Sequence, residues 1–269
     1  NPDGGSLVKI NSNGSFTEIA GGLNLPTSLE FIGNSAYIVN LVGEIWGECP
    51  EWLTGDRFDA VMNYPLAQAI LGFTAQGHLY EDVVRRHHEY GRTVVRRDAA
   101  AFGAELERLM ALYDPAVTQV QLNLLDSHDS PRFRTMAGRD RAAYHLAVLL
   151  QATLPGAPCT YYGDEIGVEG DHDPDCRRAF PWDESRWDRD GLEWTRASFS
   201  ARHALPALRR GAFRTAGAVD DTLAFVRGEA TGADAVLVVV NAGDTAAEVR
   251  VRVPALAGVT LADRPLPAG

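Results

Sequence analysis

The chain is poor in the features that mark disulfide-rich or membrane proteins. Its three cysteines, Cys49, Cys159 and Cys176, are odd in number and show no C-x-x-C spacing. Neither a disulfide framework nor a zinc site is therefore indicated. The longest apolar stretches, such as residues 235–240, fall well short of the ~18 residues that a membrane-spanning helix needs. The chain also lacks an initiator methionine and the regions of a signal peptide, so we expect a fragment or a processed chain.

Positive charge is scarce as well. The formal net charge is -11, with 25 Lys and Arg against 36 Asp and Glu. A nucleic-acid partner demands a basic surface, and an anionic lipid surface does too, so we expect no nucleic acid and no membrane partner. With 269 residues, of which 45% are hydrophobic, the chain has a soluble globular composition that is able to bury a core. A neutral or polar small substrate remains open.

Residues 1–40 differ in kind from the rest. They hold the only lysine, Lys9, and six asparagines, whereas residues 41–269 have three asparagines. Such a shift suggests that two unrelated sequences are joined, with a seam near residues 41–46. Short apolar runs separated by Asn-Gly and Gly-Gly pairs predict small antiparallel strands, at residues 7–10, 16–19 and 36–39. The pieces GSLVKI, GSFTEIAGGL, LPTSLEFIG and SAYIVN resemble one blade of a secreted β-propeller repeat.

From residue 43 onward, strand and helix patterns alternate. Strands are predicted at residues 58–62, 117–125 and 157–162, and helices at residues 102–113, 139–154 and 192–205. Strands that alternate with helices imply parallel pairing with right-handed crossovers, which places this part of the chain in the α/β class.

The pattern changes again near residue 207. Three runs are strand-like, at residues 222–227, 235–241 and 247–253. The last run alternates valine with arginine at the period of a half-buried strand. We predict a small antiparallel β-sandwich here. The expected domains are residues 1–42, 43–206 and 207–269.

One stretch of the sequence has the residues expected at a catalytic strand end. Residues 121–132, QLNLLDSHDSPR, form an apolar run that ends in Asp126, His128 and Asp129. A buried parallel strand has this appearance, and α/β folds place active sites just past such strand ends. Alternatively, the two aspartates cap the following turn or helix.

Four further motifs accompany this stretch in order: GEIWG at 43–47, DAVMNYP at 59–65, GAPCTYYGDE at 156–165 and DPDCRR at 173–178. Together they resemble the second half of the catalytic barrel of the α-amylase family, glycoside hydrolase family 13, and most of all its cyclomaltodextrinase and neopullulanase branch. The resemblance runs from residue 43 to the C-terminus. It implies a partial (β/α)8 (TIM) barrel, second half only, with a C-terminal antiparallel β-sandwich and an N-terminal β segment.

The resemblance also implies roles for individual residues. Glu44 matches the general acid, which has to carry its proton to the leaving oxygen, and we expect Trp46 to help keep it poorly solvated. Asp129 matches the third catalytic carboxylate, which grips sugar hydroxyls. The implied substrate-binding residues are His128, Asn63, Tyr64, Asp173 and Arg177.

Each of these residues also has a plainer interpretation. Glu44 alone reads as a surface glutamate, His128 as a structural histidine, and Asp173 with Arg177 as an i, i+4 ion pair. Trp182, Trp187 and Trp194 are interpreted as core or domain-seam aromatic residues.

One element of the family pattern has no match. The family's nucleophile is an aspartate on the fourth barrel strand, and residues 1–42 contain nothing like that motif. Retaining cleavage needs this nucleophile. We therefore expect a hydrolase of α-glucans by resemblance, without cofactor or metal, that is inactive alone. The alternatives are a non-catalytic carbohydrate-binding or structural remnant and an extracellular repeat protein. Unpaired sheet edges predict self-association, and a cytoplasmic location is favoured for the glycosidase part.

Overall fold

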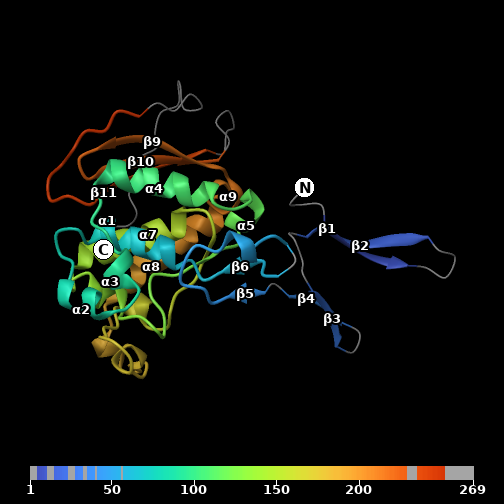
Figure 1. Ribbon diagram of the computed structural model, residues 1–269, viewed down its shortest axis with the longest axis horizontal. Coiled ribbons are helices and arrows are strands. Elements are labelled where there is room, and N and C mark those ends of the chain that lie inside the picture. Colours follow the sequence, from blue (N-terminus) through green and yellow to red (C-terminus); the bar gives the residue numbers. More distant parts are fainter. Residues whose placement is uncertain are drawn as a thin grey trace.

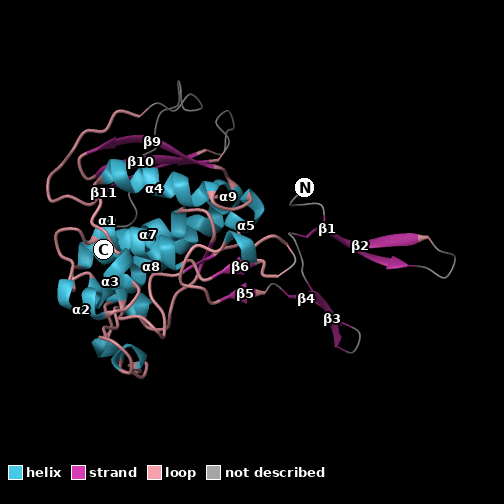
Figure 2. Cartoon of the chain, in the orientation of Figure 1, coloured by secondary structure: helices cyan, strands magenta, loops and turns pink. Residues whose placement is uncertain are grey.

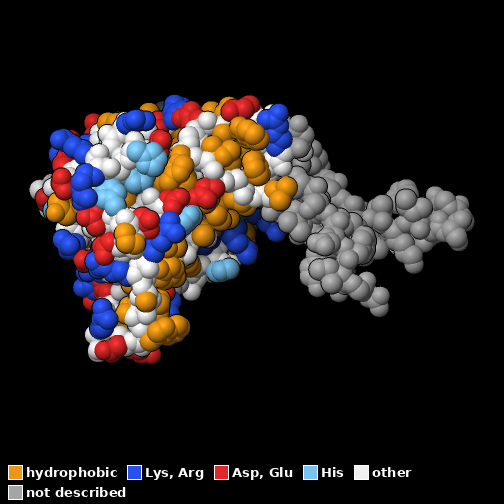
Figure 3. All heavy atoms as spheres, turned by 60° about the horizontal axis from the view of Figure 1, so that its bottom comes forward, with side chains coloured by type: hydrophobic (Ala, Val, Ile, Leu, Met, Phe, Trp, Pro, Cys, Tyr) orange, Lys and Arg blue, Asp and Glu red, His pale blue; other side chains and the backbone are white. Residues whose placement is uncertain are grey.

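The structure is a computed structural model that describes residues 5–10, 15–23, 28–32, 35–39, 41–55, 57–228 and 235–251. A body of helices is covered on one side by a three-stranded sheet and carries short parallel strands within it (Figures 1 and 2). Acidic, basic and histidine side chains are mixed over the face that Figure 3 turns forward. In the described chain, no helix combines the length and the apolar character needed to cross a membrane.

Four short strands form the part of the fold that positions the site. They are β5 (Val42–Gly43), β6 (Ala60–Val61), β7 (Leu122–Asn123) and β8 (Ala157–Pro158). β5 pairs with β6 and β7 with β8, both in parallel. A parallel bridge from Met62 to Leu122 joins the two pairs. The parallel order agrees with the sequence prediction, and the arrangement of these strands as the open second half of a barrel stays a prediction.

The strands are shorter than the sequence suggested. Residues 117–125 were predicted as one strand, but residues 115–118 form helix α5 (Pro115–Thr118). Asp114 caps this helix by accepting a hydrogen bond from Ala116 N at 2.8 Å, and Pro115 begins it with the backbone angle that a first helical turn requires. Local capping therefore overrides the apolar pattern here.

Helices surround these strands: α1 (Tyr64–Thr74), α2 (Glu81–Arg86), α3 (Tyr90–Thr93), α4 (Ala99–Ala111), α6 (Phe133–Met136), α7 (Arg141–Thr153), α8 (Arg189–Ala204) and α9 (Pro206–Arg210). Aspartate side chains accept hydrogen bonds from first-turn amides in α4, α7 and α8, which satisfies groups that a helix leaves unpaired. The helices at 102–113, 139–154 and 192–205 were predicted and are present as α4, α7 and α8. The core lies between α1 and α4, where Phe73 and Phe102 stack at 4.4 Å.

The C-terminal sheet consists of β9 (Phe213–Val219), β10 (Thr222–Arg227) and β11 (Val236–Asn241), antiparallel in the order β11-β10-β9. It packs on α4 at Gly103, where an added Cβ would lie 3.1 Å from Leu223 Cδ1. β10 and β11 were predicted, while β9 was missed. Residues 247–251 are not a strand, and residues 252–253 of that prediction lie outside the described residues. The sandwich stays a prediction.

Two buried arginines fasten this sheet and α8 to the C-terminal end of α7. Arg202 donates to Ala152 O at 2.9 Å, Leu154 O at 3.1 Å and Leu208 O at 2.8 Å. Arg227 donates to Thr153 O and to Gly211 O. Burial lowers the pKa of both guanidinium groups, and the last carbonyls of α7 carry the partial negative charge that compensates them. Helix α7 connects β7 to β8, so these contacts brace the site's framework.

The N-terminal strands form two hairpins: β1 (Gly5–Ile10) with β2 (Phe16–Leu23), and β3 (Ser28–Ile32) with β4 (Ser35–Val39), both antiparallel. The three predicted runs in this segment are strands, as expected. No pairing joins β2 to β3 among the described residues. The likeness of this segment to a propeller blade stays a prediction.

Candidate active site

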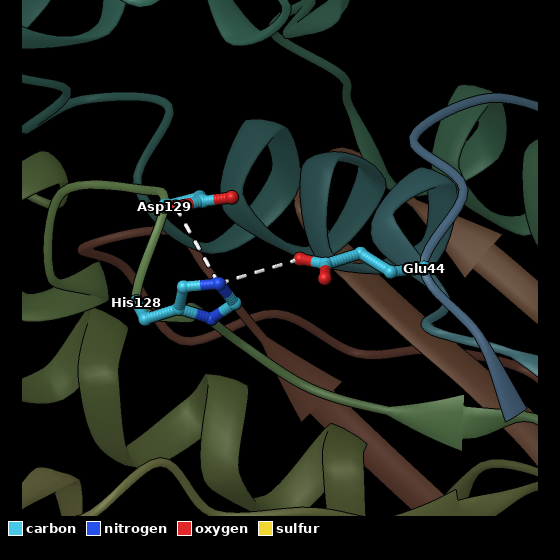
Figure 4. A group of neighbouring side chains, drawn as sticks. All are labelled: Glu44, His128 and Asp129. Carbon is cyan, nitrogen blue, oxygen red and sulfur yellow. Dashed lines mark ion pairs between the residues drawn. The ribbon is translucent and has the colours of Figure 1, made fainter.

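Glu44, His128 and Asp129 converge at one edge of the parallel strands (Figure 4). Glu44 directly follows β5, and His128 and Asp129 lie in the loop after β7. His128 Nε2 is 3.7 Å from Glu44 Oε1 and 3.5 Å from Asp129 Oδ1. One ligand atom from each of the three side chains lies within 4.8 Å of the others. Parallel strands bring their carboxyl ends to the same edge, which is why residues far apart in sequence meet here.

The buried side chain of Tyr64 contacts the Glu44 carboxyl group. Its hydroxyl lies 3.3 Å from Glu44 Oε1, to which it donates, and 2.9 Å from Ser127 Oγ. Burial raises the pKa of Tyr64, so the phenol keeps the proton it donates. Tyr64 has no exposed surface, and its hydroxyl contacts Glu44 and Ser127. Its predicted place on the cleft wall stays a prediction.

Trp46 covers Tyr64 and leaves Glu44 open. The two rings stack at a centroid distance of 3.7 Å and an angle of 16°. The Glu44 side chain is 42% exposed. Trp46 was predicted to help keep Glu44 away from water, and that prediction was wrong because the indole lies flat against Tyr64.

Asn63 joins the ends of two strands. Its Nδ2 donates to Asn123 Oδ1 at 2.9 Å, and its Oδ1 accepts from Leu66 N at the start of α1. Asn123 is fully buried and donates in turn to Pro155 O at 2.7 Å. Asn63 is thus tied to the framework under the site, and sugar contact by this residue stays a prediction.

Arg177 bridges two carboxylates beside the site. Its Nη2 lies 2.8 Å from Asp129 Oδ1, and its Nε lies 2.7 Å from Asp173 Oδ1. The same Nε is 2.9 Å from His128 O. The i, i+4 pair is therefore present, and the predicted place of Asp173 and Arg177 at a sugar subsite stays a prediction. Exposed ion pairs contribute little stability. The Arg177 ion pair therefore affects the orientation of the Asp129 carboxylate more than the stability of the fold.

A buried charge cluster lies next to this loop. Arg132 has no exposed surface and donates to Asp164 Oδ1 at 3.0 Å, Tyr162 O at 2.9 Å and Cys176 O at 2.8 Å. Asp126, 1% exposed, accepts a hydrogen bond from Phe133 N. Burial raises the pKa of Asp126 to about 6 and raises that of Asp164 well above its usual range. Asp126 is thus a framework residue that binds the first amide of α6, which agrees with the alternative that this aspartate caps the following helix.

Metal binding is the one other chemistry that this arrangement suggests. In the described ranges, Glu44, His128 and Asp129 are the one group of acidic, histidine and cysteine side chains spaced as metal ligands. The Arg177 guanidinium already occupies Asp129 Oδ1, and its positive charge opposes a cation at that oxygen.

Two residues near the site were missed by the sequence analysis. Arg132 stands in the central motif, but a sequence does not show that it is buried between two aspartates. His87 contacts the backbone oxygen of Asp129, 42 residues away in the sequence, and no local sequence pattern predicts such a contact. Among the three tryptophans interpreted as core or domain-seam residues, Trp182 is 83% exposed, so that interpretation was wrong for it.

Comparison with known proteins decides the family. Residues 28–209 match the family described as Alpha amylase, catalytic domain. The chain belongs to the α-amylase family. The match begins inside the segment 1–42, and the domain boundary predicted near residue 42 stays a prediction.

Individual α-amylase-family relatives support this assignment. A cyclomaltodextrinase of Geobacillus thermopakistaniensis is 37% identical over 211 residues, which are 78% of this chain and 33% of the relative. Neopullulanase 2 of Thermoactinomyces vulgaris is 41% identical over 175 residues, or 65% of this chain and 27% of the relative. The crystal structure of the Nostoc punctiforme debranching enzyme superposes with a TM-score of 0.72 at 36% identity, covering 77% of this chain and 42% of that one. The chain spans about a third of the length of the cyclomaltodextrinases it matches.

Proposed function

We propose that this chain carries part of the active site of an α-glucan-active glycoside hydrolase that cleaves maltooligosaccharides or cyclodextrins with retention. The observation that supports this most is the convergence of Glu44, His128 and Asp129 from two strand ends. The names of the relatives, cyclomaltodextrinase and neopullulanase, point to the same substrate class.

In this proposal Glu44 is the general acid that protonates the leaving oxygen. Tyr64 holds its carboxyl group in place through the 3.3 Å contact. Asp129 accepts hydrogen bonds from sugar hydroxyls and stabilises the positive charge that develops on the ring. His128, between the two carboxylates, donates to the same sugar. Arg177 keeps Asp129 oriented and, with Asp173, borders the next sugar position.

Turnover by this chain alone is expected to be very slow. In the described part of the chain, only Glu44 and Asp129 bring carboxylates into the group, and both already have roles. Asp126 and Asp164 are 1% and 5% exposed and bound to Arg132, so neither reaches a sugar as a substitute nucleophile. A general acid contributes roughly 10²–10⁴-fold, well below the about 10⁶-fold or more that an enzyme supplies.

The site is also open, which sets an upper limit on affinity. The side chains of Glu44 and His128 are each 42% exposed, and that of Asp129 is 41% exposed. Ligand sites normally enclose most of their ligand. We expect maltooligosaccharide affinity no better than roughly millimolar, or about -4 kcal/mol.

The activity test compares the chain with its Glu44→Gln variant. Both are incubated at high purity with maltohexaose and with β-cyclodextrin, and new reducing ends are followed over days. We expect no turnover above background in either, because residues of one catalytic unit are not additive and the acid achieves little without a nucleophile. Clear turnover that disappears in Glu44→Gln would contradict this expectation.

The second candidate function is a non-catalytic carbohydrate-binding remnant. The exposure of Glu44, at 42%, favours it, because a general acid works best where water is excluded. Sugar binding without turnover is the result that both candidates share for the isolated chain. The same assay on a longer chain that supplies the fourth barrel strand separates them, since only a catalytic site then gains activity.

A further inference from the structure

His87 stands at the corner between α2 and α3 and is almost completely buried. Its Nδ1 lies 3.3 Å from Glu89 N and 3.2 Å from Tyr90 N. Its Nε2 lies 2.9 Å from the carbonyl oxygen of Asp129. Both ring nitrogens are therefore used, one within its own corner and the other on the loop that carries the proposed sugar site.

These partners fix the tautomer of the ring. Two backbone N–H groups point at Nδ1, which must accept and so carries no proton. The carbonyl oxygen of Asp129 only accepts, so Nε2 must carry the proton and donate it. Burial lowers the pKa of His87, which keeps the ring in this neutral form.

His87 also contacts the loop that carries Glu44. Its ring lies 5.1 Å from that of Trp46 at an angle of 43°, and Trp46 in turn stacks on Tyr64, whose hydroxyl meets Glu44. The His172 ring lies nearly parallel to the His87 ring, at a centroid distance of 5.9 Å. One buried side chain thus connects the Glu44 loop, the Asp129 loop and the α2–α3 corner.

We propose that His87 is a positioning residue of the sugar site. Its Nε2–H group holds the backbone at Asp129, and so sets the distance of the Asp129 carboxylate and the His128 ring from Glu44. His87 does not touch the sugar itself. The inference rests on the proposed function, because it assigns His87 to that same site.

Two substitutions separate the two halves of this role. In His87→Gln the side-chain NH2 takes roughly the place of Nε2 and preserves the donor to Asp129 O. In His87→Asn the side-chain oxygen takes roughly the place of Nδ1 and preserves the acceptor for Glu89 N and Tyr90 N, but the donor is lost. Each variant loses one side of the ring's bonding, so both are expected to lose similar stability in urea unfolding. His203→Asn, at an exposed histidine of α8, is the control.

The decisive readout is maltohexaose affinity, measured by NMR titration of backbone amides. We expect affinity about tenfold weaker in His87→Asn and within about threefold of the unmutated chain in His87→Gln, which is the scale of one hydrogen bond. Equal losses in both variants, following their stabilities, would make His87 a purely structural residue and overturn the proposal.

A second measurement does not depend on sugar. Long-range ¹H–¹⁵N correlation spectra of the histidine rings should show His87 as the neutral Nε2–H tautomer, and His87→Asn should shift the amides of His128 and Asp129 more than His87→Gln does. An Nδ1–H or charged ring, or equal shifts, would refute the positioning role. If the unmutated chain shows these signatures but binds no maltohexaose, the proposed function fails and the placement of His87 stands.

Discussion

Replacing Arg132 by methionine is expected to lower the free energy of unfolding by about 3–5 kcal/mol, the scale for breaking a buried ion cluster by removing one partner. Arg132 has no exposed surface, and its removal leaves the carboxyl groups of Asp126 and Asp164 without a counter-charge. The carbonyls of Tyr162 and Cys176 lose their donor as well. Urea unfolding followed by tryptophan fluorescence and circular dichroism measures the loss.

Arg177→Met is the matched control for this variant. Arg177 makes ion pairs of similar length, but its side chain is 45% exposed and water replaces the lost partners. We expect a change within about 1 kcal/mol for it. A loss in Arg132→Met no larger than that in Arg177→Met would show that the buried cluster does not support the loop that carries His128 and Asp129.

Replacing Asp164 by asparagine is expected to change how stability depends on pH. Burial raises the pKa of Asp126 from 3.8 to about 6 and raises that of Asp164 well above 3.8. When the folded-state pKa of an acid lies above its unfolded value, the folded state holds the proton more tightly. The stability from this pair is therefore fully present below pH 4 and is lost as the pH rises through 6 and above.

Asparagine keeps the size of the side chain and an oxygen for Arg132 Nη1, but leaves one carboxylate facing one guanidinium. Relative to the unmutated chain, Asp164→Asn should gain stability between pH 5 and pH 8, because it no longer has the buried carboxyl group whose ionisation destabilises the folded state in this range. Asp175→Asn serves as the control. Arg178 lowers the pKa of the Asp175 carboxyl, so this group is ionised in both the folded and the unfolded chain between pH 5 and pH 8. A constant difference between Asp164→Asn and the unmutated chain from pH 5 to pH 8 would refute the raised pKa values.

Which side chains form the candidate site could largely be predicted from sequence, because the motifs that carry them are recognisable by their residues. The resemblance to the α-amylase family implied that Glu44, His128 and Asp129 belong to one site, and in the structure these side chains lie together. Burial was harder to predict. Asp126 stands two residues before His128 in the same motif, yet it points into the core because Arg132 and Asp164 are there to pair with it.

Contacts that depend on tertiary structure could not be predicted. His87 meets Asp129 only because the α2–α3 corner folds back over the loop after β7. Trp46 was expected to cover Glu44, but the direction of an indole ring depends on its neighbour, here Tyr64. Strand β9 was missed because its residues are only partly buried or exposed, so it lacks a continuous apolar run. Strand β10 is buried throughout and was predicted.

The most direct test of the account is an NMR titration of the ¹⁵N-labelled chain with maltohexaose, alongside Asp129→Ala. We predict saturable binding at roughly millimolar concentration, with the largest shifts at Glu44, His128, Asp129 and Arg177. In Asp129→Ala these shifts should be lost, with the remaining spectrum unchanged. Binding that persists in Asp129→Ala, or no binding at tens of millimolar sugar by the unmutated chain, would contradict the assignment of this group as an α-glucan site.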